Sequence, residues 1–165
     1  MILPIITIPN PILKKKCILV KEFNKDLQDL ILNMVETLHA NKGVGLAAPQ
    51  IGKNIKLIVI EFDPVKYYNK EELTKKSNKP IPLTILVNPK IISYSNDKTT
   101  EIEGCLSCPE VEVEVIRSKK IKIISQDISG KRIKIKASDF YARVLQHEID
   151  HLNGILITDN IKTKK

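Results

Sequence analysis

Two histidines and a glutamate near the end of the chain have a spacing that suits metal chemistry. His147 and His151 are four residues apart, and Glu148 directly follows the first of them. On an α-helix, residues four apart lie on the same face, so both imidazoles can bind one metal ion. The Glu148 carboxylate would then be close enough to take a proton from water. This H-E-x-x-H pattern predicts a metal-dependent hydrolase.

A catalytic metal of this kind needs a third protein ligand beside one open position. A third histidine is missing, because Ile157 occupies its place in the extended motif. A thermolysin-like glutamate is missing too, since Asp159 is the sole carboxylate after His151. The ligand must therefore come from upstream, where Cys105 and Cys108 stand in a compact polar turn. A thiolate with two imidazoles suits zinc or ferrous iron.

The number of cysteines that bind would decide the kind of site. With one cysteine the metal keeps an open position and the site is catalytic. With Cys105 and Cys108 both bound, four positions are filled and the site is a closed structural zinc site. The long gap between the cysteine and histidine pairs, and a glutamate placed to act on water, favour the catalytic arrangement. A zinc peptidase and a non-catalytic metal module are the alternative functions.

The first half of the chain predicts one helix and two strands. Apolar residues recur at helical spacing over residues 24–41, and Gly43 follows as a stop signal. This predicts an N-terminal amphipathic helix. The β-branched runs at 55–62 and 83–92 predict strands. The polar segment 63–82 between them is interpreted as a surface excursion.

The second half predicts antiparallel strands. Hydrophobic residues alternate with period two from Val111 onward, and again over 120–124 and 132–136. Ser129 and Gly130 between the last two runs indicate a hairpin turn.

A second helix follows these strands and carries the H-E-x-x-H motif. Ser138 or Asp139 can cap its start, and apolar residues on two sides predict that it is largely buried. Gly154 is expected to end it, and residues 155–157 resemble a short strand. The predicted fold class is α+β, with antiparallel sheets packed around this central helix.

Length and cysteine content point to a single domain in a reducing compartment. A chain of 165 residues can bury one core, so we expect one catalytic domain spanning 1–165. Three cysteines are too few and odd in number for a disulfide scaffold, which favours a cytoplasmic protein. Pro4, Pro9 and Pro11 interrupt the apolar start, unlike a signal peptide, and no stretch is long enough to cross a bilayer.

The net charge of +8 permits work near an acidic partner such as ribosomal RNA. Lysines gather at 14–16 and 162–165, although a solvated lysine-rich surface is the simpler interpretation. The chain has only three arginines, Arg117, Arg132 and Arg143, which argues against base-specific DNA recognition. We expect Arg117 and Arg143 to be structural charges.

Three segments resemble the signature segments of peptide deformylases, in the family's order: 43–50, 103–107 and 146–154. The resemblance implies a small α+β enzyme that removes the formyl group from the N-terminal formylmethionine of new polypeptides and releases formate. It implies one divalent metal per chain, with ferrous iron as the expected native ion and zinc or nickel as alternatives. It also implies a bacterial-type cytoplasmic enzyme that associates transiently with the ribosome, without a specific DNA or a membrane partner.

The resemblance further implies roles for individual residues. It makes Glu148 the general acid and base, with the Gln50 side chain and the Leu106 amide stabilising charge on the formyl oxygen. The implied metal ligands are Cys105, His147 and His151. The implied substrate-binding residues are Val44, Gly45, Glu103 and Val144.

Within that set, Val44 and Gly45 would offer main-chain partners to an extended peptide. Val44, Leu106 and Val144 would line a pocket for the methionine side chain. Cys108 stands where relatives commonly have an aliphatic residue, so we expect a small buried apolar side chain there. His39 and Cys17 lie outside the three segments and are not expected to bind metal.

Overall fold

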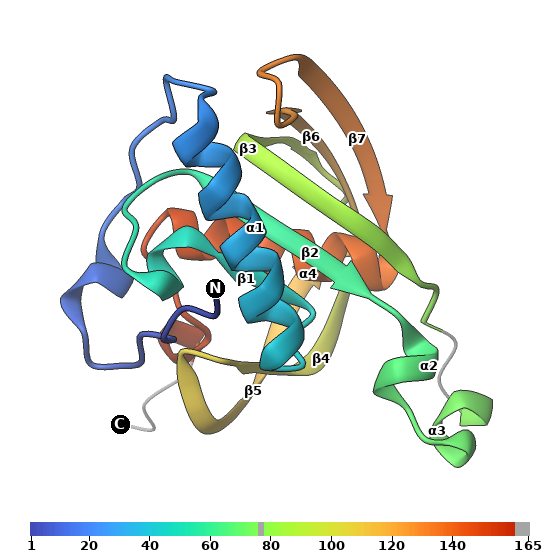
Figure 1. The fold of residues 1–165 in the computed structure, drawn as a ribbon. Helices are drawn as coiled ribbons and strands as arrows, with labels where there is room; N and C mark the ends of the chain where they lie inside the picture. The colour runs from blue at the N-terminus through green and yellow to red at the C-terminus, as the bar shows by residue number, and fades with distance from the viewer. Residues whose placement is uncertain (76–77, 161–165) are drawn as a thin grey trace.

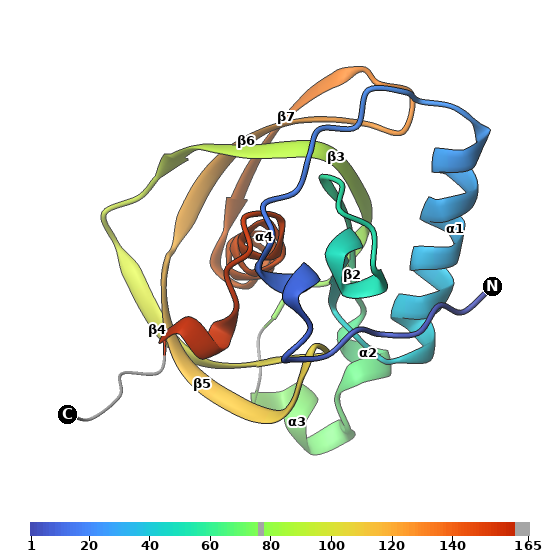
Figure 2. The same cartoon turned by 90° about the vertical axis from the view of Figure 1, so that its left-hand side faces the viewer.

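Two antiparallel sheets surround the C-terminal helix α4, Asp139–Leu152, in the computed structural model of the chain (Figures 1 and 2). The structure describes residues 1–75 and 78–160, so the lysine-rich segment 162–165 lies outside the described residues. The mixed α+β class with antiparallel sheets is as predicted.

The larger sheet has five strands in the order β1-β2-β3-β6-β7, and each neighbouring pair is antiparallel. Its strands are β1 Gly45–Ala47, β2 Leu57–Phe62, β3 Ile81–Tyr94, β6 Lys120–Gln126 and β7 Arg132–Ser138. Strands β6 and β7 form the predicted hairpin, with Gly130 at a φ of 85° in its turn. The short strand β1 was not predicted, because three residues are too few to show an alternation.

The smaller sheet is a hairpin of β4, Lys98–Cys105, and β5, Cys108–Ser118. Strand β4 was not predicted, because its residues are mostly polar and its one large apolar side chain, Ile102, is 66% exposed. The expected polar turn is therefore short: only two residues separate the strands, and Cys105 is the register partner of Cys108.

Helix α1, Lys25–Ala40, lies within one residue of each predicted end. The Asn24 side chain caps it by accepting a hydrogen bond from the Leu27 N–H at 3.1 Å. The buried residues of α1 pack on strands β1 and β2, on the opposite side of the larger sheet from α4. Two short helices, α2 Pro64–Tyr67 and α3 Lys70–Lys75, lie in the excursion expected over 63–82.

The described residues also form three short 3-10 helices: η1 Pro11–Lys14, η2 Ala48–Ile51 and η3 Ile157–Asn160. The prediction of a short strand over 155–157 is wrong, because the chain turns into η3 instead. The Asp159 carboxylate accepts a hydrogen bond from the Leu156 N–H at 2.9 Å, which closes this turn. The apolar side chains of Leu156 and Ile157 are buried in a small cluster with Leu13 and do not belong to a sheet.

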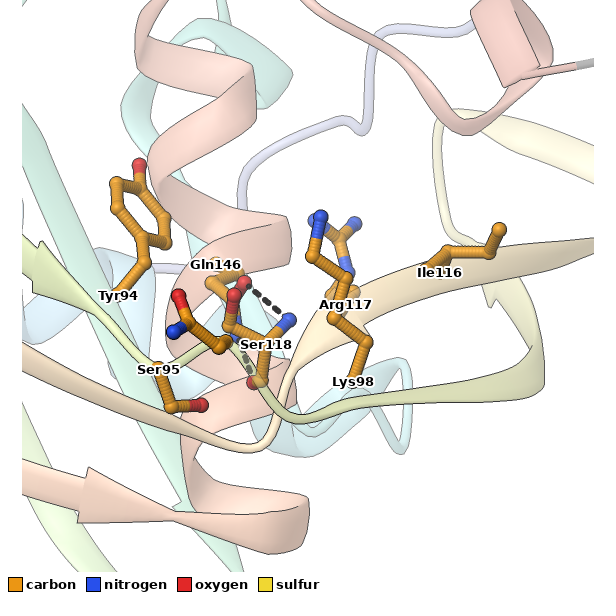
Figure 3. Close-up of a pocket in the computed structure, with 8 residues that line it drawn as sticks. Tyr94, Ser95, Lys98, Ile116, Arg117, Ser118 and Gln146 are labelled. Carbon is orange, nitrogen blue, oxygen red and sulfur yellow. Dashed lines mark hydrogen bonds between the residues drawn. The ribbon is translucent and has the colours of Figure 1, made fainter.

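Helix α4 fills the space between the sheets, and its apolar side chains join the main core. Gln146 fastens it to the end of β5: its side chain accepts a hydrogen bond from the Ser118 N–H at 3.1 Å and donates one to the Ser118 carbonyl at 2.9 Å. Figure 3 shows this pair at the wall of a surface cavity. The helix ends at Leu152, and Gly154 adopts a φ of 72° where a Cβ atom would lie 2.4 Å from the Lys14 carbonyl oxygen.

Over residues 1–75 and 78–160, no helix combines the length and the apolar character that a membrane crossing requires.

Candidate active site and metal centre

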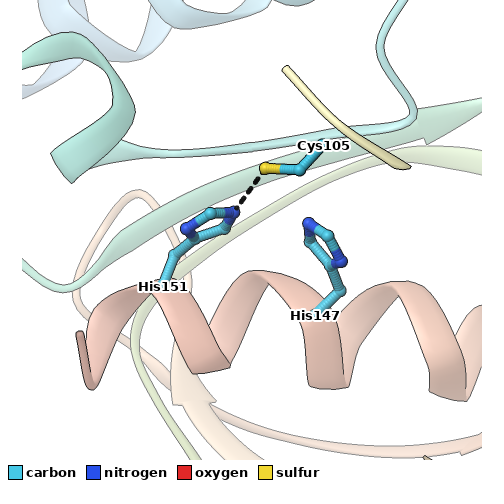
Figure 4. Close-up of side chains that lie close together, drawn as sticks. All are labelled: Cys105, His147 and His151. Carbon is cyan, nitrogen blue, oxygen red and sulfur yellow. Dashed lines mark hydrogen bonds between the residues drawn. The ribbon is translucent and has the colours of Figure 1, made fainter. Parts of the chain in front are cut away.

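Helix α4 presents His147 and His151 toward the end of β4, where Cys105 is located (Figure 4). The two imidazole rings lie one helical turn apart, with their centroids separated by 5.0 Å. The Cys105 sulfur lies 3.2 Å from Nε2 of His151. One ligand atom from each of the three residues lies within 4.8 Å of the others. The structure thus brings together the three residues that the resemblance implied as ligands.

This donor set fits a divalent metal. One thiolate and two imidazoles are the ligand types that zinc and ferrous iron accept. Nδ1 of His147 is 2.9 Å from the Glu103 carboxylate, which leaves Nε2 as the ring nitrogen available to a metal ion. Such a carboxylate-to-histidine contact is common behind metal-binding histidines, where it fixes the ring and its tautomer.

Cys108 is not part of this group of possible ligands. Its side chain is 1% exposed and packs with Leu13, Val115 and Leu156. Burial raises the pKa of its thiol to about 11, which keeps it protonated. In the described part of the chain, the group therefore contains one cysteine. This favours three protein ligands with an open position over a closed four-ligand site.

The two other residues set aside by sequence also lie elsewhere. Cys17 is buried in the main core, and its N–H donates to the Leu152 carbonyl at 2.9 Å. His39 pairs with Glu61 near the end of α1. Neither residue belongs to the ligand group.

Glu103 is the centre of a buried charge network behind the ligands. Its carboxylate accepts hydrogen bonds from Arg117 at 2.6 and 2.9 Å and from Arg143 at 2.7 Å, besides the contact with His147. Burial alone raises the pKa of Glu103, but the hydrogen bonds with His147 and Arg117 outweigh it and lower the pKa to about 2. Arg117 also donates to Asp150 at 2.7 Å. Both arginines are thus structural charges that hold Glu103 ionised.

The network occupies both carboxylate oxygens of Glu103. Both of its carboxylate oxygens already have partners within the protein, although the residue borders the active-site cavity. The expected contact between Glu103 and the substrate stays a prediction.

The two histidines differ in their affinity for protons. Burial opposes protonation of both rings, but hydrogen bonds with Cys105 and Glu103 raise the pKa of His147 to about 10. Burial and the neighbouring His147 hold the pKa of His151 well below its ordinary value. Metal binding requires both rings to be neutral, so it would release the proton from His147.

Glu148 lies beside the ligands and has a free oxygen. Its side chain is buried, and burial raises its pKa to about 7. A carboxyl group with a pKa near the working pH is well suited to accept a proton and return it. Its Oε2 atom makes no hydrogen bond to any described residue. The carboxyl group also borders the backbone of Gly45, where an added Cβ atom would lie 2.3 Å from Oε1.

Gln50 is held so that its amide group faces Cys105. Its Oε1 atom accepts a hydrogen bond from the Ala47 N–H at 2.8 Å, within the turn of η2. Its Nε2 atom is 3.2 Å from the Ser107 hydroxyl and 3.7 Å from the Cys105 sulfur. The tight Ala47–Gln50 turn therefore aims a hydrogen-bond donor at the candidate metal site.

A cavity of about 480 Å³ opens over these groups. It is lined by all four residues implied as substrate-binding: Val44, Gly45, Glu103 and Val144. Leu106, Gln50, Cys105, His147 and Glu148 line it as well, whereas His151 lies deeper and does not. The structure thus gathers the predicted site residues around one cavity.

Sequence reasoning missed two aromatic residues of the cavity wall, Phe140 and Tyr67. Phe140 could have been found, because it lies one helical turn before Val144 on the same side of α4. Tyr67 comes from the short helix α2 in the surface excursion, and no pattern in the sequence indicates that it returns to the site.

Comparison with known families and curated proteins gives a consistent result. The family model described as polypeptide deformylase matches residues 2–165. A peptide deformylase of Thermodesulfovibrio yellowstonii is 41% identical over 164 residues, covering 99% of this chain and 92% of the relative. One from Desulfotalea psychrophila is 38% identical, covering 99% and 90%.

Solved structures with the same fold carry the same name. The crystal structure of peptide deformylase from Thermotoga maritima matches with a TM-score of 0.83 and 36% identity, covering 99% of both chains. A peptide deformylase from Acinetobacter baumannii, described as bound to Met-Ala-Ser, matches with a TM-score of 0.87 and 29% identity, covering 98% of this chain and 99% of that one.

Proposed function

This chain belongs to the peptide deformylase family, and we propose that it removes the formyl group from the N-terminal formylmethionine of new polypeptides and releases formate. The observation that carries this proposal is that Cys105, His147 and His151 come together beside the buried Glu148, and that Cys105, His147 and Glu148 line one cavity. Family membership makes the chain a metallo-hydrolase. The reaction on the formyl group is the proposed step.

We propose one divalent metal per chain, held by Cys105, His147 and His151. Ferrous iron is the proposed native ion, and zinc or nickel can replace it, because these ions accept the same ligand types. When bound, the metal would act as a Lewis acid on the formyl carbonyl and lower the pKa of water from about 16 toward 7.

Glu148 would manage the proton in this reaction. Its free Oε2 atom can take a proton from the attacking water, and the same carboxyl can pass it to the departing amine nitrogen. A positioned group of this kind contributes roughly 10²- to 10⁴-fold to the rate. The Gln50 amide and the Leu106 backbone N–H would donate to the formyl oxygen as its charge develops; losing one such donor costs roughly 3 kcal/mol.

The cavity walls fit a peptide that begins with methionine. Val44, Val144 and Leu106 would surround the methionine side chain, and Phe140 extends this apolar wall. The main chain of Val44 and Gly45 would pair with the extended peptide, so that recognition depends little on later side chains. The Met-Ala-Ser peptide described for the Acinetobacter relative supports a ligand of this class.

For Glu103 we propose a positioning role beside the predicted contact with the substrate. Its carboxylate orients His147, and Arg117 and Arg143 occupy its remaining hydrogen-bonding capacity. We further propose that residues 1–165 act as one catalytic domain, and that its nascent-chain substrates bring it into transient association with the ribosome.

The test is formate release from formyl-Met-Ala-Ser by chain loaded anaerobically with ferrous iron. Glu148→Gln is the matched control, because glutamine keeps the side-chain size but cannot accept the proton. We expect the variant to retain metal and to lose activity by roughly 10²-fold or more. A metal-loaded wild type that releases no formate, or that cleaves internal bonds of unformylated peptides as a zinc peptidase would, would contradict the proposal.

A further inference from the structure

One half of the outer surface of the larger sheet is strongly basic. In β6 and β7, alternate residues face α4 and are at least partly buried, and the residues between them are exposed. The exposed positions on these strands and the adjoining part of β3 include six cations, which we call the basic face: Lys90, Lys120, Lys122, Arg132, Lys134 and Lys136. In Figure 2, α4 lies on the inner side of β6 and β7, and their other side faces away from the molecule.

The charge of the basic face is not balanced locally. Strands β3, β6 and β7 contain no aspartate or glutamate. Among residues 1–75 and 78–160, no carboxylate forms an ion pair with any of the six cations. Some cations elsewhere do form ion pairs, as in Lys14 with Asp159 and Lys25 with Asp29. The basic face is therefore a region of unopposed positive potential.

Two of its lysines are placed where they repel each other. Lys122 on β6 and Lys136 on β7 are direct register partners, and like charges in that position destabilise a sheet. Lysines on an edge strand can serve to block aggregation, and β7 is an edge strand. That explanation does not cover Lys120 and Lys122, because β6 has a neighbouring strand on each side.

The basic face also contains a hollow with the groups that bind phosphate. A cavity of about 330 Å³ is lined by Lys120, Lys122 and Lys136 together with three serines: Ser93, Ser95 and Ser138. Ser93 is the register partner of Lys122, so these two residues are neighbours on adjacent strands. Lysine and serine side chains are common partners of phosphate oxygens in nucleic acids.

We propose that the basic face binds the phosphate backbone of RNA without reading its bases. Rows of cations along two strands complement a linear polyanion, and counterion release drives such binding. Five of the six cations are lysines, which act as point charges and lack the bidentate geometry of base recognition. A lipid surface fits less well, since membrane-surface binding of this kind usually uses an amphipathic helix with an apolar face.

The choice of RNA over other polyanions rests on the proposed function, because a nascent polypeptide is attached to a ribosome. RNA binding and formate release are measured separately, so either can fail without the other.

The test measures binding of a fluorescently labelled single-stranded RNA of mixed sequence by anisotropy, over a range of salt concentrations. The variant Lys122→Glu/Lys136→Glu reverses the charge of two lysines at the centre of the basic face. The two register partners still carry like charges, so they repel each other in the variant as in the wild type. The control Lys15→Glu/Lys16→Glu makes the same change in net charge at two exposed lysines outside the sheet. Formate release from a short formylated peptide and the unfolding temperature are recorded for each.

We expect the face variant to weaken RNA binding by about tenfold or more at moderate salt, with the control close to wild type. The plot of log K for RNA association against log salt concentration has a negative slope, and this slope should become shallower by about 1.4. Two lysines are replaced, and each phosphate contact contributes about 0.7 on single strands. Formate release should stay within about twofold, since the substitutions lie outside the catalytic cavity. Equal weakening by both variants, or an unchanged affinity in the face variant, would overturn the proposal. So would a wild type that binds phosphatidylserine vesicles through this face but not RNA.

Discussion

Oε2 of Glu103 lies 2.9 Å from Nδ1 of His147, although the two residues are 44 positions apart and belong to a strand and a helix. The same carboxylate is bound by two buried arginines, one from β5 and one from α4. The smaller sheet and the central helix are thus joined through one anion directly behind the candidate metal site. The orientation of the metal ligand His147 and the stability of the fold therefore depend on the same side chain, Glu103.

Glu103→Gln should therefore destabilise the protein strongly. The substitution leaves Arg117 and Arg143 buried without the negative charge they share, and breaking a buried pair in this way costs roughly 3 to 5 kcal/mol. Denaturant unfolding of wild type and variant measures the difference. Asp29→Asn is the matched control, because the pair of Asp29 with Lys25 is exposed and should contribute less than about 0.5 kcal/mol. Similar losses in both variants would mean that the network is not structural.

Cys105→Ala should abolish metal binding, whereas Cys108→Ala should retain it. The Cys105 sulfur faces the two histidines, and Cys108 packs in an apolar cluster with a thiol pKa raised to about 11. Elemental analysis after loading and extensive dialysis measures the metal content of each. If Cys108→Ala lost metal as readily as Cys105→Ala, the site would be a closed one with both cysteines as ligands.

Gly45→Ala should impair catalysis while leaving the metal bound. The added methyl group would lie 2.3 Å from Oε1 of Glu148, so the carboxyl must move away from its buried position. Misplacing a catalytic group by about 1 Å can cost about 100-fold in rate, so kcat for formate release should fall by that order. Gly104→Ala is the comparison, because a methyl group there meets no atom closer than 4.0 Å. A larger loss in Gly104→Ala than in Gly45→Ala would contradict this account.

Lys122→Glu should stabilise the protein slightly. It replaces the like-charge pair with Lys136 by an opposite-charge pair across β6 and β7, which is worth about 0.5 kcal/mol. Thermal unfolding at low salt should show a higher midpoint, and added salt should reduce the gain. The same substitution should weaken RNA binding, so gain of stability and loss of binding should occur together. A lower midpoint would show that the two lysines do not repel each other.

Several elements followed from local patterns in the chain. The apolar spacing over 24–41 predicted α1, and the alternation over 120–136 predicted the β6–β7 hairpin, because each buries one face. Strand β4 had no such signal: it is polar, and Ile102 on it is exposed. The apolar run at 155–157 gave a wrong strand prediction, because its buried side chains pack at a turn and not in a sheet.

Within the site, the types of the reactive groups could be recognised from sequence alone. The H-E-x-x-H spacing identified His147, Glu148 and His151, because a regular helix relates residue number directly to direction in space. The choice between Cys105 and Cys108 needed either the family resemblance or the folded chain. Two cysteines three residues apart are equivalent in a sequence, but in the folded chain Cys105 lies beside the two histidines, whereas Cys108 is buried in an apolar cluster.

The sequence by itself determined the helical metal motif, the mixed class of the fold and the family to which the chain is similar. Tertiary structure alone decided which charges meet Glu103, that Tyr67 returns to the cavity, and that six cations share one uncovered sheet face. The reason is physical: helix and strand periodicity are properties of neighbouring residues, whereas burial, desolvation and electrostatic fields depend on groups brought together from distant parts of the chain.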